Sequence, residues 1–125
     1  MTGMTFDVVR LAEFERDMRR LLRHYSTLEE DLGTFLGTAV VAYHRLGHDT
    51  GIVQIAGLGP TRLPVFKARK FACRSLKGRG ARTGLRLIYA LDVENNRIEL
   101  IEIYFKANQE NEDRERIGRY YLTRA

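Results

Sequence analysis

The chain has 125 residues, of which 44% are hydrophobic and 30% are charged, and its formal net charge at pH 7 is +5. This length suits one domain with its own core, which we place at residues 1–125, and it is short for two domains. There is no apolar run of 18 residues, a single cysteine (Cys73) and no secretory pattern in the first 17 residues, so we expect a cytoplasmic protein without membrane spans or internal disulfides.

The first part of the chain predicts one strand and two helices. Residues 5–10 (TFDVVR) are rich in β-branched side chains, which is typical of a short strand. Apolar residues then recur at steps of three and four across 11–25 and again across 28–46, which predicts two amphipathic helices. The short connection between them favours an antiparallel helical hairpin.

The second part predicts three strands and a closing helix. Residues 65–71 (VFKARKF) alternate apolar and basic side chains, as a half-buried strand does. Residues 85–92 (LRLIYALD) also predict a strand, with Leu85, Leu87, Tyr89 and Leu91 on one face and Arg86, Ile88 and Ala90 on the other. Residues 97–105 (RIELIEIYF) are apolar on both faces, which indicates a central strand covered by a helix. The Asn95-Asn96 pair suits the tight turn between the last two strands, and a narrow apolar stripe in 108–125 predicts a short helix.

These elements follow the order βααβββα. Such an order predicts an α+β fold in which the helical hairpin packs on one face of an antiparallel sheet and a short C-terminal helix follows.

Positive charge is concentrated in the middle of the chain. Residues 50–91 contain nine Lys or Arg and no Asp or Glu, whereas each flanking segment contains six basic and eight acidic residues. A segment of this kind attracts phosphate groups or an acidic protein surface. The alternative is an ordinary solvated face that the acidic flanks partly neutralise.

Three of these cations are expected on one face of the sheet. Lys67 and Arg69 are two residues apart in a strand, so they point the same way, and Arg86 lies opposite the apolar row of the next strand. Lys77, Arg79 and Arg82 belong to a glycine-rich loop that would carry them over the edge of this face.

A cationic face of this kind suits a phosphodiester backbone, which arginine binds through paired, charge-assisted hydrogen bonds. In RNA the 2′-hydroxyl lies beside its own phosphate. A protein can therefore promote cleavage by orienting that attack, moving protons and stabilising charge on phosphorus, with no metal and no cofactor required.

The segments GLRLIYALD and RIELIEIYFK, which follow a basic strand and two helices, resemble the RelE/ParE superfamily of toxins from toxin–antitoxin pairs. The RelE branch implies a ribosome-dependent endoribonuclease that cuts mRNA. On the matching positions, the resemblance implies catalytic roles for Lys67, Arg69 and Arg86. It places Lys106 at the family's lysine that ends the last core strand, and Lys77, Arg79, Arg82 and Lys106 would bind RNA.

Two positions differ from the RelE pattern. Ala107 stands where an arginine follows the last lysine, and the tail NQENEDRERI has no tyrosine or histidine and is acidic. The alternative function is therefore a non-catalytic binding module on the same fold, either a ParE-like inhibitor of a protein such as DNA gyrase or an inactive toxin remnant.

The expected partners are an acidic antitoxin protein and mRNA on the ribosome, and both a monomer and a homodimer are compatible with the sequence. A metal site is not expected. His44 and His48 are four residues apart at a helix end, but no third ligand has a convincing spacing.

Overall fold

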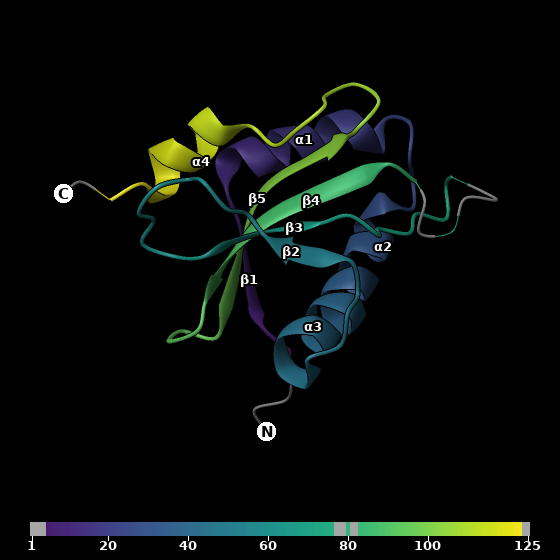
Figure 1. The fold of residues 1–125 in the computed structure, drawn as a ribbon. Coiled ribbons are helices and arrows are strands. Elements are labelled where there is room, and N and C mark those ends of the chain that lie inside the picture. Colours follow the sequence, from purple (N-terminus) through teal and green to yellow (C-terminus); the bar gives the residue numbers. More distant parts are fainter. Residues whose placement is uncertain (1–4, 77–79, 81–82, 124–125) are drawn as a thin grey trace.

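The structure is a computed structural model that describes residues 5–76, 80 and 83–123, and Figure 1 shows the arrangement of its elements. The predicted α+β class is confirmed, with one strand more than expected. The elements in chain order are β1 (Asp7–Arg10), α1 (Ala12–Leu22), α2 (Leu28–Phe35), the π-helical turn η1 (Leu36–Val40), α3 (Val41–Leu46), β2 (Ile52–Gln54), β3 (Val65–Ala68), β4 (Leu85–Asp92), β5 (Arg97–Phe105) and α4 (Arg114–Tyr121).

The strands form one five-stranded sheet in the order β1-β5-β4-β3-β2. The prediction of an antiparallel sheet is wrong at one edge, because β1 runs parallel to β5 while the other neighbours are antiparallel. A parallel pair needs a long crossover, and here the helices and the other strands lie between its two members in sequence. The added strand β2 has only three residues, too few to show an alternating pattern.

One face of the sheet packs against α1, α2, η1 and α3, which confirms the predicted position of the helical hairpin. The β4 residues expected on one face, Leu85, Leu87, Tyr89 and Leu91, lie in this core with apolar side chains of both predicted helices. Full burial of one large apolar side chain, such as Leu or Phe, contributes about 1.5–3 kcal/mol to the stability of the fold. The buried members include Phe14, Met18, Leu28, Leu32, Phe35, Leu85, Leu87, Tyr89 and Leu91.

The opposite face is covered by the C-terminal helix α4 and by part of segment 55–63. Ile117 and Tyr121 of α4 pack there on Val65, Ile88 and Ile101 of the sheet. Asp113 caps the helix by accepting a hydrogen bond from the Arg116 amide at 3.0 Å.

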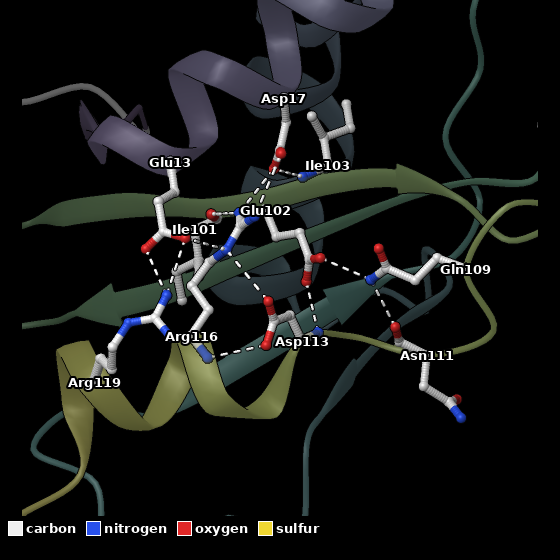
Figure 2. A network of polar contacts seen from close by, with 10 residues as sticks. All are labelled: Glu13, Asp17, Ile101, Glu102, Ile103, Gln109, Asn111, Asp113, Arg116 and Arg119. Carbon is white, nitrogen blue, oxygen red and sulfur yellow. Dashed lines mark hydrogen bonds and ion pairs between the residues drawn. The ribbon is translucent and has the colours of Figure 1, made fainter.

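A polar network ties α4 to both α1 and β5 (Figure 2). Arg116 Nη1 lies 2.8 Å from Asp17 Oδ2 and also donates to the Ile101 carbonyl at 2.8 Å. Asp17 Oδ2 accepts a second bond from the Ile103 amide at 3.2 Å. Both side chains are about nine-tenths buried, and Asp17 depends on Arg116 for compensation of its charge, whereas Arg116 also lies 3.3 Å from Glu13.

We expect Arg116→Met to lower the free energy of unfolding by about 3 kcal/mol, because it leaves the Asp17 carboxylate buried without its counter-charge. Arg119→Met is the matched control, since Arg119 is exposed and pairs with Glu13 at the surface. Chemical denaturation should show a large loss for the first variant and little change for the second. Equal losses of stability in the two variants would contradict the conclusion that the Asp17 carboxylate depends on Arg116.

Candidate functional site

Three cationic residues lie where β3 and β5 end and β4 begins. Arg69 follows β3, Arg86 is the second residue of β4, and Lys106 follows β5. Arg86 Nη1 donates to the Arg69 carbonyl at 3.2 Å, and the Lys106 amide donates to the Gly84 carbonyl at 2.9 Å. Among the described residues none of the three has an acidic partner, so this end of the sheet carries uncompensated positive charge.

Lys67 lies further into the sheet on the same face as Arg86. It is directly opposite Ile88 of β4, and Arg86 precedes Ile88 by two residues, so both side chains point to the face that α4 covers. This shared face agrees with the sequence prediction. Arg69, which the sequence placed within this strand, directly follows its last residue; it is exposed, and its amide donates to the Gly51 carbonyl at 3.0 Å.

The amino group of Lys67 is occupied by an acid that the sequence did not place there. Lys67 Nζ lies 2.9 Å from Glu112 Oε1, and Arg114 Nε donates to Glu112 Oε2 at 3.1 Å. The Glu112 side chain is only 5% exposed. Its burial raises the pKa of the carboxyl, but the Lys67 hydrogen bond and the nearby charges outweigh burial, so the pKa is lowered and the carboxylate stays charged.

Tyr104 is a site residue that the sequence pattern did not select. It lies directly opposite Arg86 in the β4–β5 ladder, it is 6% exposed, and its buried hydroxyl has no hydrogen-bond partner among the described residues. Burial, followed by the charges of Glu112 and Glu102, raises the pKa of Tyr104 to about 12, so the hydroxyl keeps its proton. Its position opposite Arg86 in a paired strand was the signal that could have found it.

The segment that brings Glu112 to Lys67 connects β5 to α4, and we call residues 106–113 the strap. The buried carboxylate of Glu102 holds it by accepting from Gln109 Nε2 at 2.7 Å and from the Asp113 amide at 2.8 Å (Figure 2). Burial raises the pKa of Glu102 despite these bonds. Strap residues and Tyr104 line a common cavity of about 210 Å³.

Other residues noted in the sequence are the loop cations, the histidines and the cysteine. Lys77, Arg79 and Arg82 lie outside the described residues. His44 Nε2 lies 2.7 Å from the Tyr89 hydroxyl, and burial lowers the pKa of its imidazole to about 4. Among the described residues no three His, Cys, Asp or Glu side chains gather into a set that could hold a metal ion. Cys73 is buried.

Comparisons of the chain with protein-family models, with curated proteins and with solved structures find no match. Within the described part of the chain, no helix is both long enough and apolar enough to cross a membrane.

The arrangement can bind an anion and move a proton. Arg69, Arg86 and Lys106 supply fixed positive charge at the end of the sheet, Arg86 is the cross-strand partner of Tyr104, and Lys67 lies on the same face. These are groups that bind phosphate oxygens and donate protons to them.

The unpartnered hydroxyl of Tyr104 gives a prediction about stability. We expect Tyr104→Phe to leave the free energy of unfolding unchanged or to raise it, because the variant buries no unsatisfied polar group. The matched control is Tyr121→Phe, since the Tyr121 hydroxyl donates to buried Glu99 Oε1 at 2.6 Å, and its loss should cost about 2 kcal/mol. Similar destabilisation of both variants in chemical denaturation would show that the Tyr104 hydroxyl has a structural bond.

Proposed function

We propose that this protein is a RelE-like toxin of a toxin–antitoxin pair and that it cleaves mRNA at the ribosome. The observation that carries the proposal is the cationic end of the sheet, where Arg69, Arg86 and Lys106 have no acidic partners among the described residues, next to buried Tyr104. The resemblance of GLRLIYALD and RIELIEIYFK to that superfamily, and the sheet with helices on one face, support it.

In the proposed reaction the RNA 2′-hydroxyl attacks its own phosphorus while losing a proton. The bond from phosphorus to the 5′-oxygen breaks, the leaving oxygen takes up a proton, and a 2′,3′-cyclic phosphate remains. No metal or cofactor takes part, because the nucleophile is already beside the phosphate and the side chains supply the charge.

The residues have separate roles in this proposal. Lys67 and Arg69 bind the scissile region and serve proton transfer, and Arg86 stabilises the charge that develops on the phosphate oxygens. The RNA backbone is held by Lys106 and by loop residues Lys77, Arg79 and Arg82. An acidic antitoxin would bind the same positive surface and keep RNA away.

A second candidate is a non-catalytic binding module on this fold, as in the ParE branch. The specific observation in its favour is the Lys67–Glu112 contact, which occupies one expected catalytic amino group with a buried carboxylate. In this alternative the cationic end of the sheet is a docking surface for a protein.

We expect the purified protein to cut mRNA on translating ribosomes and the triple variant Lys67→Ala, Arg69→Ala, Arg86→Ala to cut it at least about 100-fold more slowly, the scale of electrostatic and acid–base contributions to such reactions. Primer extension of the mRNA locates and quantifies the cuts. A control variant with Arg16→Ala, Arg19→Ala and Arg23→Ala removes the same charge from exposed positions of α1 and its C-cap and should cut normally.

Absence of cuts by the folded, unmodified protein on active ribosomes would contradict the nuclease proposal and favour the binding module. Equal loss of cutting in both triple variants would show that net charge, rather than the sheet face, is responsible.

A further inference from the structure

The strap is held closed by polar contacts rather than by hydrophobic burial. Its sequence is KANQENED, in which Ala107 is the sole hydrophobic residue, and Ala107 is exposed. Its side chains are held by the contacts of Gln109 with Glu102 and Asn111, of Glu112 with Lys67 and Arg114, and of Asp113 with Arg116. Polar contacts of this kind can be exchanged for contacts with water or with a ligand, so the strap can open locally.

The elements on either side of the strap have anchors outside it, although the strap residue Asp113 also caps α4. Before it, β5 is paired along its length with β4. After it, α4 is held by the buried side chains of Ile117 and Tyr121 and by the pair of Arg116 with Asp17. The strap can therefore open between two fixed ends without unfolding the sheet or releasing α4.

The contacts of Glu112 have the chemistry of an anion site. One oxygen faces the Lys67 amino group and the other faces the Arg114 guanidinium. Two further hydrogen bonds position the Arg114 guanidinium, because its Nη1 donates to the Ala56 and Gly57 carbonyls at 3.2 and 3.4 Å. Two cations that share one carboxylate would equally hold two oxygens of a phosphate group.

We propose that Glu112 holds the place of a substrate phosphate, so that the strap is a built-in competitor that an RNA phosphodiester must displace to reach Lys67 and Arg114. This inference rests on the proposed function, since the displacing ligand is RNA. It extends that function by adding Arg114 to the phosphate site and by making access to Lys67 depend on the strap.

Binding of a non-cleavable RNA tests the inference without reference to cleavage. The probe is a short 2′-O-methyl oligonucleotide, whose affinity is measured by fluorescence anisotropy at fixed salt concentration. We expect Glu112→Gln to tighten binding about tenfold, because it frees Lys67 and Arg114 of their intramolecular anion. Glu110→Gln removes the same charge from an exposed position of the strap and should change the affinity less than about threefold.

A second variant separates strap opening from the loss of a negative charge. Gln109→Ala removes the contacts of Gln109 with Glu102 and Asn111 and leaves the net charge unchanged. We expect about threefold tighter binding of the same oligonucleotide, because a less stable closed strap competes less well with RNA for Lys67 and Arg114. Hydrogen exchange of the Asp113 amide, which donates to Glu102 when the strap is closed, should become faster in this variant and on addition of RNA to the unmodified protein.

The outcomes distinguish this inference from the proposed function. Equal affinities of the Glu112→Gln and Glu110→Gln variants, or unchanged Asp113 exchange on RNA binding, would overturn the strap inference even if the protein cuts mRNA. Tighter binding by Glu112→Gln and Gln109→Ala together with faster Asp113 exchange would support it even if no variant cuts mRNA, and would then describe a gated RNA-binding site.

Discussion

The buried ion pair of Arg116 with Asp17 is the contact on which the C-terminal region depends. It joins α4 to α1, and the additional bonds to the Ile101 carbonyl and from the Ile103 amide attach both partners to β5. A buried pair of this kind gives little net stability but penalises any arrangement that separates the charges. The position of α4 in turn fixes where the strap ends, and therefore which basic residue the Glu112 carboxylate meets.

The fold redistributes the charge that the sequence concentrates in residues 50–91. Acids from the flanking segments neutralise part of it: Arg74 pairs with Asp31 and Glu30, and Lys67 pairs with Glu112. Arg69 and Arg86, with Lys106 from the last strand, are left without acidic partners among the described residues. These three cations of the described residues lie together at one end of the sheet, beside Tyr104.

Local patterns predicted the long elements of this protein well. Residues 85–92 and 97–105 form strands with the predicted bounds, and the Asn95-Asn96 turn was identified because asparagine tolerates the positive φ of 51° that Asn96 adopts. The parallel pairing of β1 was not predictable, because the partner of an edge strand is chosen by tertiary packing and not by its own side chains.

The candidate site was predictable only in part, again because tertiary packing decides which residues meet. Strand alternation placed Lys67 and Arg86 on one face, but it said nothing of which residues would cover that face. The Lys67–Glu112 contact spans 45 positions in the chain and depends on how α4 docks. Tyr104 was passed over because a tyrosine in an apolar strand is ordinarily a packing residue, and its unpartnered hydroxyl is visible only in three dimensions.

A crystal structure of the protein with a short 2′-O-methyl RNA tests the central claim most directly, because it locates the bound phosphate. The account predicts a phosphate within about 3 Å of Lys67 Nζ and next to Arg86, with Glu112 displaced from Lys67. RNA bound at another surface, with the Lys67–Glu112 contact intact, would contradict it.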